Sequence, residues 1–337
     1  MDLFDLVIIG GGPTGLFAAY YSGLRGMKTK IIDALPQLGG QLTALYPEKY
    51  IYDVAGFTKV FAKDLAAELI QQAVQYDPEV CLEEKITSMD FHEEGGKRVF
   101  RLTNEVGREH HTKAILLTVG IGAFAPRKLT LQDAKRFEGS GVFYFVKNRD
   151  SLRGKKLLIV GGGDSAVDWA LNLDGVAEDI TLIHRRDEFR AHEDSVKKLF
   201  DGSARVKLFY ELKAIHGNNH VEGVTIFQNR TMEEESFPVD QILLNLGFVA
   251  NLGAIKDWGL DIEKNDVKVT SRMETNIPGI YAAGDIVTYP GKLKLIATGF
   301  GEAAVAVNAI KSFIDPAAKF FPGHSSEMAP PPSGRRA

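Results

Sequence analysis

Short runs of consecutive apolar residues, each followed by glycine, recur along this chain. The run at residues 6–9 leads into the glycine turn at residues 10–15 (GGGPTG), and residues 16–24 predict a helix. A strand, a glycine turn and a helix in this order are typical of a dinucleotide-binding unit. In such a unit Gly10 makes the turn, Gly12 admits a pyrophosphate, and Gly15 lets the helix pack closely on the strand.

An acidic residue follows the second apolar run of this unit. Residues 29–32 predict a strand that ends in Asp33, 21 residues after Gly12. At this distance a carboxylate accepts hydrogen bonds from the hydroxyl groups of a nucleotide ribose.

The same pattern occurs a second time. A strand at residues 156–160 leads into the turn GGGDSA at residues 161–166, a helical stretch at residues 167–173 and a strand at residues 180–183. The residue 21 positions after Gly163 is here His184, followed by Arg185 and Arg186. One unit therefore ends its second strand in a carboxylate and the other in a cationic cluster.

This difference in charge suggests two different nucleotides. A carboxylate repels a 2′-phosphate, whereas guanidinium groups pair with it, so the first unit suits a free ribose, as in FAD, and the second suits NADP(H). Arg190 can return to the same phosphate if the chain turns into a helix after Arg186, but it can equally be a surface arginine. The alternative for the cluster is a solvated loop, which its position at a strand's carboxyl end disfavours.

Three further glycine-terminated strands indicate the domain order. Those at residues 114–120 and 241–247 bracket the second unit, and the one at residues 279–285 follows it. We therefore expect an α/β protein with two nested Rossmann-like dinucleotide-binding domains. The FAD domain comprises residues 1–119 and 248–337, with a tail at 316–337, and residues 120–247 form the inserted NADP(H) domain. Residues 99–102 and 224–227 predict antiparallel strands, one in each domain.

Charge and cysteine content exclude several function classes. The chain has 40 Lys and Arg against 44 Asp and Glu, a net charge of −4, so no basic field indicates nucleic acid or an anionic membrane. No apolar run is long enough to span a membrane, and the acidic residues 1–5 run straight into a predicted strand, so we expect no signal peptide. Cys81 is the single cysteine, which excludes an internal disulfide, a redox pair and a cysteine-based zinc site. We expect a cytoplasmic protein without a metal.

Taken together, these motifs resemble the low-molecular-weight thioredoxin reductases over nearly the whole chain. The resemblance rests on the two glycine turns, on HRRDEFRA at residues 184–191 and on AGD at residues 283–285. That family has a reducible cysteine pair just before its second glycine turn, where this chain has FYFVKNRD at residues 143–150. The chain is more similar to the cysteine-free branch, the thioredoxin-reductase-like ferredoxin-NADP reductases, on account of GGQL at 39–42, YPEKY at 46–50 and the tail FFPGHSSE at 320–327.

The resemblance implies a role for individual residues. Tyr50 and His324 would stack on opposite faces of the flavin, with His324 arriving on the tail of a partner subunit. The other implied FAD contacts are Gly10, Gly12, Pro13, Thr14 and Gly15 at the pyrophosphate, Asp33 at the ribose, Ile86 beside the adenine, Gln41, Tyr46 and Phe124 nearer the ring, Asp285 at the ribityl and phosphate region, and Ser326 after the stacking residue. The NADPH contacts are Gly161, Gly163, Asp164, Ser165, His184, Arg185, Arg186 and Arg190. A helix opened by residues 295–301 would point its N-terminus at the pyrimidine end of the flavin.

Some of these residues also have plain structural readings. Tyr46 and Tyr50 lie in an aromatic-rich stretch and can simply pack. Asp285 can cap a helix, and His324 lies near a Pro-rich terminus, where disorder is the default.

Three functions follow from this sequence. The main one is transfer of a hydride between NADPH and FAD and of single electrons between FAD and ferredoxin or flavodoxin, by a homodimer. The second is an NADPH oxidase or quinone reductase on the same fold. The third is a flavin- or nucleotide-sensing protein without turnover.

Overall fold

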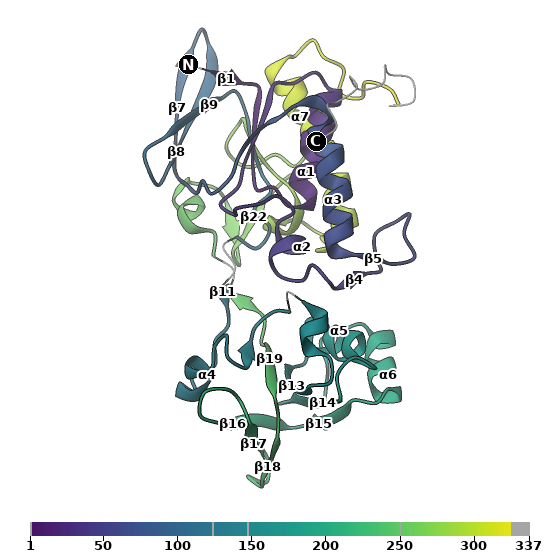
Figure 1. The fold of residues 1–337 in the computed structure, drawn as a ribbon. Coiled ribbons are helices and arrows are strands. Elements are labelled where there is room, and N and C mark those ends of the chain that lie inside the picture. The colour runs from purple at the N-terminus through teal and green to yellow at the C-terminus, as the bar shows by residue number, and fades with distance from the viewer. Residues whose placement is uncertain (1, 123–124, 147, 250, 325–337) are drawn as a thin grey trace. The chain divides into compact units, whose positions relative to one another are not determined.

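The computed structural model describes residues 2–122, 125–146, 148–249 and 251–324. The chain divides into two compact units (Figure 1). Unit 1 comprises Met1–Ala44, Ile51–Phe124 and Ala250–Ala337, and unit 2 comprises Leu45–Tyr50 and Ala125–Val249. Nothing in the sequence pattern signals that the short stretch Leu45–Tyr50 belongs with unit 2.

Unit 1 is built on a five-stranded parallel sheet with the strand order β23-β10-β2-β3-β6. Its strands are β2 (Leu6–Ile9), β3 (Thr29–Ile32), β6 (Glu79–Cys81), β10 (Ile115–Leu117) and β23 (Ile280–Ala282). β23 pairs with β10 although the two lie far apart in sequence. The third glycine-terminated strand of the sequence pattern therefore completes the sheet of the first unit.

Smaller sheets complete unit 1. The four-stranded sheet β1-β9-β8-β7 comprises β1 (Leu3–Phe4), β7 (Ile86–Glu94), β8 (Lys97–Asn104) and β9 (Glu109–Thr112). The three-stranded sheet contains β21 (Ile262–Glu263), β22 (Asp266–Lys268) and β24 (Val287–Thr288). The short strands β4 (Tyr50–Ile51), whose first residue is the last of the stretch assigned to unit 2, and β5 (Val60–Phe61) precede α3.

The helices of unit 1 are α1 (Pro13–Leu24), α2 (Gln41–Ala44), α3 (Ala62–Ala73) and α7 (Ile296–Ile314), with the 3₁₀ turns η1 (Val74–Tyr76), η3 (Gly253–Asp257) and η4 (Gly284–Ile286). Figure 1 shows α1 between α3 and α7. In α3 the buried residues Ala62, Leu65, Ala66, Leu69 and Ala73 recur at helical spacing, so one face of the helix packs inward.

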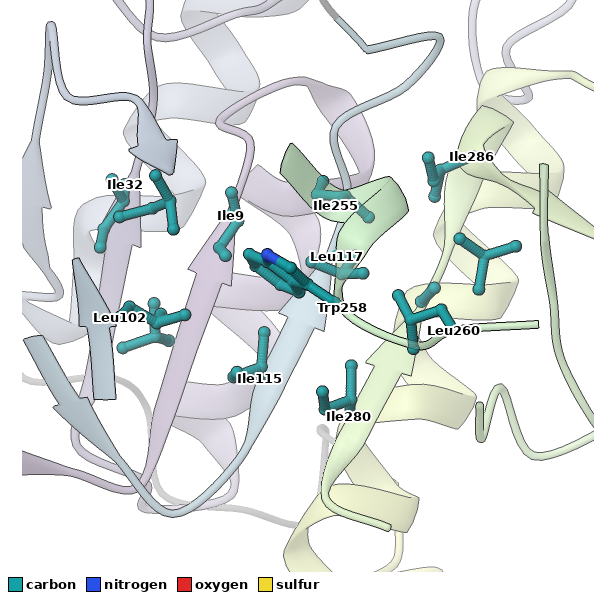
Figure 2. Packing of buried hydrophobic residues seen from close by; sticks show 14 of the residues in the cluster. Ile9, Ile32, Leu102, Ile115, Leu117, Ile255, Trp258, Leu260, Ile280 and Ile286 are labelled. Carbon is teal, nitrogen blue, oxygen red and sulfur yellow. The ribbon is translucent and has the colours of Figure 1, made fainter. Parts of the chain in front are cut away.

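The core of unit 1 follows from the alternation of side chains along its strands. Ile9, Ile115, Leu117 and Ile280 share one face of the sheet and pack with Trp258, as Figure 2 shows. Their neighbours along the strands point to the opposite face and are equally buried, so the sheet is covered on both sides. This two-sided burial explains why the strands read as continuous apolar runs rather than as alternating patterns.

Unit 2 repeats this architecture with different strands. Its parallel sheet has the order β12-β19-β13-β14-β15, formed by β12 (Val142–Phe143), β13 (Lys156–Gly161), β14 (Asp179–His184), β15 (Arg205–Leu208) and β19 (Gln241–Asn245). An antiparallel sheet contains β16 (Tyr210–His216), β17 (Gly223–Gln228) and β18 (Glu234–Pro238). The helices are α4 (Gln132–Arg136), α5 (Asp164–Leu173) and α6 (Glu193–Asp201), with the 3₁₀ turn η2 (Arg149–Leu152), and β11 (Ala125–Pro126) pairs with β20 (Phe248–Val249).

The two faces of the unit 2 sheet have different covers. Leu157 and Ile159 pack with Trp169 of α5, whereas Leu158 and Val160 pack with Ile226 of the antiparallel sheet. The predicted antiparallel strands at 99–102 and 224–227 are thus confirmed as parts of β8 and β17.

Both helices that follow the glycine turns start three residues earlier than the apolar pattern predicts. α1 begins at Pro13 rather than residue 16, and α5 begins at Asp164 rather than residue 167. The N-cap residues are Gly12 and Gly163, so the glycine turn itself supplies the first turn of each helix. Among the described residues no helix is both long and apolar enough to cross a membrane.

Candidate nucleotide-binding sites

The first glycine turn, residues 10–15, has almost no space for side chains. Gly10 has φ +109°, and a Cβ there would lie 2.5 Å from the Thr118 carbonyl oxygen. A Cβ on Gly15 would lie 2.0 Å from the Gly10 carbonyl oxygen. The Thr118 hydroxyl donates to that same oxygen at 2.7 Å. The structure therefore requires glycine at both positions, at Gly10 because of the positive φ of the turn and at Gly15 because α1 packs closely on the strand.

Gly12 differs from these two because it has space beside it. A Cβ on Gly12 would find only the Gly40 Cα, at 3.9 Å, within contact range. Gly12 is also the N-cap of α1, and among the described residues no side chain caps this helix. Uncapped N–H groups at a helix N-terminus bind phosphates. The turn therefore forms a cradle that fits a pyrophosphate and that any larger residue at position 12 would fill.

Asp33 follows β3 and braces the turn from the other side. Its Oδ2 accepts a hydrogen bond from Gly11 N at 2.6 Å, and its Oδ1 accepts one from Leu35 N at 2.8 Å. Burial raises the pKa of the carboxyl group, and the backbone hydrogen bonds oppose that rise. Each oxygen keeps a second lone pair, so the predicted hydrogen bonds to ribose hydroxyls are still available.

The start of α7 meets the start of α1 at Thr14. A Cβ on Gly299 would lie 2.3 Å from Thr14 Oγ1, and a Cβ on Gly284 would lie 2.8 Å from it. Asp285 is in the η4 turn next to Gly284, and burial raises the pKa of its carboxyl group while Lys292 and Lys294 lower it. The segment AGD and the N-terminal turn of α7 are thus brought to the first glycine turn.

Glu302 is a residue that the sequence reading missed. Its carboxylate is 5 % exposed and accepts hydrogen bonds from Gly284 N at 2.7 Å, from the Tyr289 hydroxyl at 2.6 Å and from Lys292 Nζ at 2.6 Å. Burial and this carboxylate together raise the pKa of Tyr289 to about 12. A buried charge needs such partners, and the signal available in the sequence was a glutamate among the small apolar residues of α7.

Of five further predicted FAD residues, the structure places three and does not describe the other two. Gln41 opens α2, and its Nε2 lies near Gly120. Ile86 opens β7 and is buried in the core of unit 1. Phe124 and Ser326 lie outside the described residues. His324 is exposed, and its ring contacts that of Phe321 edge to face at 5.4 Å.

Tyr46 and Tyr50 are in the stretch that belongs to unit 2. Tyr46 packs against the core of that unit, and Lys49 Nζ lies 5.5 Å from the centre of its ring. Lys49 also forms an ion pair with Asp168 of α5 at 2.5 Å. These contacts hold the stretch on α5.

The second glycine turn, residues 161–166, is braced by packing. A Cβ on Gly161 would lie 2.5 Å from the Asn245 carbonyl oxygen, and one on Gly162 would lie 2.1 Å from the His184 ring. His184 stacks on Phe189 with ring centres 5.2 Å apart, and its Nε2 donates to the Glu188 carbonyl at 3.0 Å. Burial lowers the pKa of His184, and the nearby arginines lower it further. His184 is therefore neutral and lies against the turn.

Arg185, Arg186 and Arg190 are exposed, and none of them forms an ion pair with a carboxylate of the described chain. Arg190 N donates to the Gly162 carbonyl at 2.7 Å, which places the backbone of Arg190 at the turn. The arginines are thus available to an anion, as the sequence predicts for a 2′-phosphate.

Asp164 and Ser165 begin α5. Asp164 Oδ1 accepts a hydrogen bond from His192 N at 3.2 Å, so this carboxylate holds the segment that follows the arginines. Ser165 is exposed and lines a pocket.

This pocket lies within unit 2 at the carboxyl end of β19. Its lining includes Tyr46, Lys49, Tyr144, Ser165, Trp169 and Asn245. Asn245 Oδ1 is buried and has no hydrogen-bond partner among the described residues. A buried acceptor without a partner is costly, so a ligand N–H group directed at it would fit. The sequence reading missed Asn245, although a polar residue at the end of the apolar run ILLN was a visible signal.

Cys81, Glu84 and His110 lie close together in unit 1. Their potential metal-ligand atoms are within 4.8 Å of one another. His110 Nε2 lies 2.9 Å from Glu84 Oε2, and His110 Nδ1 lies 3.2 Å from Lys30 Nζ. Since the ammonium group donates to Nδ1, Nε2 carries the proton that binds Glu84. Both ring nitrogens are engaged, and a cation here would face the charge of Lys30. The sequence did not anticipate this cluster.

Comparison with known proteins identifies reductases that use pyridine nucleotides. Residues 4–311 match the family model of the pyridine nucleotide-disulphide oxidoreductases. A ferredoxin-NADP reductase 2 of Chloroherpeton thalassium is 55 % identical over 330 residues, covering 96 % of this chain and 95 % of that protein. A ferredoxin-NADP reductase 2 of Shouchella clausii is 53 % identical over 328 residues, covering 97 % and 98 %.

Among solved structures, the thioredoxin reductase of Lactococcus lactis is similar with a TM-score of 0.80 and 26 % identity, over 92 % of this chain and 99 % of that one. The thioredoxin reductase of T. acidophilum has a TM-score of 0.80 and 24 % identity, over 93 % and 99 %. The expected fold, with two Rossmann-like parallel sheets of the thioredoxin reductase type, is confirmed.

Proposed function

Because the chain belongs to the ferredoxin-NADP reductases of the pyridine nucleotide-disulphide oxidoreductase family, we propose that it transfers electrons between NADP(H) and ferredoxin or flavodoxin through FAD. When bound, FAD exchanges a hydride with the nicotinamide and single electrons with a protein carrier. The residues of this chain bind and orient the two nucleotides.

The observation that carries this proposal is the difference in charge after the second strand of each unit, where one unit has a carboxylate and the other has two arginines. Asp33 follows β3 as a carboxylate, whereas β14 ends at His184 and is followed by Arg185 and Arg186. A carboxylate favours the free ribose of FAD, and the exposed arginines favour the 2′-phosphate of NADP(H). We therefore assign the domain of residues 1–119 and 248–337 to FAD and that of residues 120–247 to NADP(H).

In the FAD domain the pyrophosphate lies in the cradle at Gly12, against the N-terminus of α1. Asp33 takes the ribose, Ile86 lies beside the adenine, and Asp285 holds the ribityl and phosphate region. The N-terminus of α7 points at the pyrimidine end of the ring, where its positive dipole end stabilises the charge of the reduced state.

In the NADP(H) domain the nicotinamide end enters the pocket beside the second glycine turn. There Asn245 Oδ1, which has no partner among the described residues, would accept a hydrogen bond from the carboxamide NH₂ group. Gly161, Gly163, Asp164 and Ser165 line the pyrophosphate.

Tyr50 and His324 cover the two faces of the flavin, with Gln41, Tyr46, Phe124 and Ser326 around it. His324 would come from the tail of a second copy in a homodimer, and it would be the stacking residue that moves aside for the nicotinamide, because a terminal tail moves more readily than a packed loop. Electrons leave without a cysteine relay, since Cys81, the single cysteine, is a buried thiol. A free thiol is typical of a reducing compartment, which supports the cytoplasm as the location.

An anaerobic titration tests the function directly. The purified protein, loaded with FAD, is titrated with NADPH, and oxidised ferredoxin or flavodoxin is then added while the flavin absorbance is recorded. We expect bleaching by about one equivalent of NADPH and rapid recovery of the absorbance on addition of the carrier.

Each failure points to a different activity. Recovery with oxygen or a quinone, but not with either carrier, would indicate an oxidase or quinone reductase. Absence of bleaching on a catalytic timescale would indicate a nucleotide-sensing protein. A protein that cannot take up FAD at all contradicts the assignment of the first glycine turn.

A further inference from the structure

The tail that follows α7 is held at its root by a buried arginine of α1. Arg25 closes α1 and is 9 % exposed. Its Nη1 donates to the Phe320 carbonyl at 2.9 Å, and its Nη2 donates to the Lys319 carbonyl at 2.7 Å. One guanidinium group thus binds two consecutive carbonyl oxygens of the tail.

Arg25 is itself oriented by α7. Its Nη1 donates to Asn308 Oδ1, and Asn308 Nδ2 donates to the Ala304 carbonyl at 2.9 Å. Asn308 is 7 % exposed, so both partners of this bond are nearly out of water. A second arginine, Arg272, lies over the Phe320 ring at 5.0 Å. The root of the tail is therefore fixed from two sides.

Burial makes this contact difficult to break. A guanidinium group removed from water must keep its donors paired, and two of the acceptors of Arg25 are carbonyls of the tail. If the tail left, two hydrogen bonds of the guanidinium group would be lost, while Asn308 Oδ1 would remain as an acceptor. Hydrogen bonds from a charged donor are also among the strongest in proteins. We expect the tail to stay anchored at Phe320 while the residues beyond it move.

The anchor limits where His324 can reach. Four residues beyond Phe320 span about 14 Å at full extension, whereas the 12 residues of α1 measure about 18 Å. Arg25 closes the end of α1 that is opposite its glycine turn. The anchor therefore starts the path to His324 at the end of α1 that is remote from the glycine turn of its own chain.

We propose that Arg25, oriented by Asn308, is a positioning residue that anchors the C-terminal tail and so places His324 for the flavin of a second copy. This inference rests on the proposed function for the role of His324. The anchor itself is independent of that function, and the two are tested separately.

Trypsin tests the anchor. The peptide bond between Lys319 and Phe320 is a tryptic site whose carbonyl is bound by Arg25. In Arg25→Lys the charge is kept, but the contact with two carbonyls is lost. We expect cleavage after Lys319 to be about tenfold faster. Mass spectrometry of the digested full chain measures this rate. Asn308→Ala should act in the same direction with a smaller effect. The matched control is Arg98→Lys, since Arg98 also donates to a backbone carbonyl, that of Pro278 at 3.0 Å, but contacts no carbonyl of the tail in the described residues.

A double-mutant cycle tests the link to His324. In the FAD-loaded protein, Arg25→Lys should change kcat for NADPH-dependent ferricyanide reduction and shift the flavin absorbance band. Both effects should disappear in the His324→Ala background, because a misplaced tail no longer matters when its stacking residue is gone. KM for NADPH should change little, since Arg25 is not in the NADP(H) domain.

The outcomes separate the two ideas. Unchanged cleavage after Lys319 in both Arg25→Lys and Asn308→Ala overturns the anchor. Faster cleavage together with equal effects of Arg25→Lys in the presence and absence of His324 overturns the positioning role. Faster cleavage and full coupling in a protein that fails to reduce ferredoxin would support the anchor and contradict the proposed acceptor.

Discussion

The two glycine turns share a backbone plan and differ in what braces them. In the first turn, polar side chains do the bracing, as the Thr118 hydroxyl donates to the Gly10 carbonyl and Asp33 accepts from Gly11 N. In the second, the strand position that corresponds to Thr118 is occupied by Asn245, whose Oδ1 is left without a partner in the described chain. The first turn is braced by side chains of its own unit, whereas the second keeps a buried acceptor and three exposed arginines for a ligand.

The largest expected effect concerns the last residue of each six-residue turn, Gly15 in the first and Ala166 in the second. Gly15→Ala places a Cβ against the Gly10 carbonyl oxygen, so we expect a loss of about 3 kcal/mol in the free energy of unfolding and loss of FAD. The matched variant is Ala166→Gly in the second turn, which should cost only about 0.5–1 kcal/mol. Urea unfolding and the flavin content after purification measure both effects. A loss of stability in Gly15→Ala no larger than that in Ala166→Gly would contradict the steric clash expected at Gly15.

The next effect concerns the arginines that distinguish the second turn. Arg185→Ala removes a charge-assisted phosphate contact worth about 1.5–3 kcal/mol, so KM for NADPH should rise about tenfold or more. KM for NADH should hardly change, because NADH lacks the 2′-phosphate. Steady-state kinetics with both nucleotides measure the ratio. Arg153→Ala, an exposed arginine paired with Asp150, serves as the control.

Asn245→Leu should give a smaller effect of a different kind. The variant loses a neutral hydrogen bond of about 0.5–1.5 kcal/mol to the nicotinamide end, so KM should rise several-fold for NADPH and NADH alike. Thermal stability without nucleotide should stay the same or increase, because the buried acceptor has no partner to lose. A drop in stability without nucleotide would mean that Asn245 serves the fold instead.

Acidification should change the contributions of His184 and Asp33 to the free energy of unfolding in opposite directions. Burial lowers the pKa of His184, so the stability gained from its neutral form is lost as pH falls below its unfolded value of about 6.5. Burial raises the pKa of Asp33, so the folded state takes up a proton before the unfolded state does and gains stability relative to it as pH falls toward 3.8.

Melting temperatures between pH 7.5 and 5 test the histidine part of this contrast. The decline on acidification should be smaller in His184→Gln than in the unmodified protein. An identical decline in both would show that the protonation of His184 does not contribute.

The local order of elements could be predicted from sequence, because it depends on short-range patterns. Gly10, Gly15 and Gly161 were identified from spacing alone, and the structure shows a steric reason for each. The sheet to which the strand at residues 279–285 belongs was also predictable, since a buried parallel strand needs a neighbour with which to pair.

Residues whose partners lie far away in the chain were not predictable. Glu302 stands out as a glutamate among the small apolar residues of α7, but that pattern does not reveal its partners Gly284, Tyr289 and Lys292. Arg25 ends a helix, and nothing nearby in sequence reveals that its partners are at positions 308, 319 and 320. Long-range polar contacts of this kind have no periodicity, and a single sequence contains no other record of them.

The attachment of Leu45–Tyr50 to unit 2 matters to anyone who builds chimeras of such enzymes. A graft cut at the two obvious crossover points, near residues 125 and 249, would transfer Asp168 and leave its partner Lys49 behind. The recipient would have to supply a compatible hexapeptide from its own sequence. Exchange of coenzyme preference between relatives should therefore succeed more often when both segments travel together.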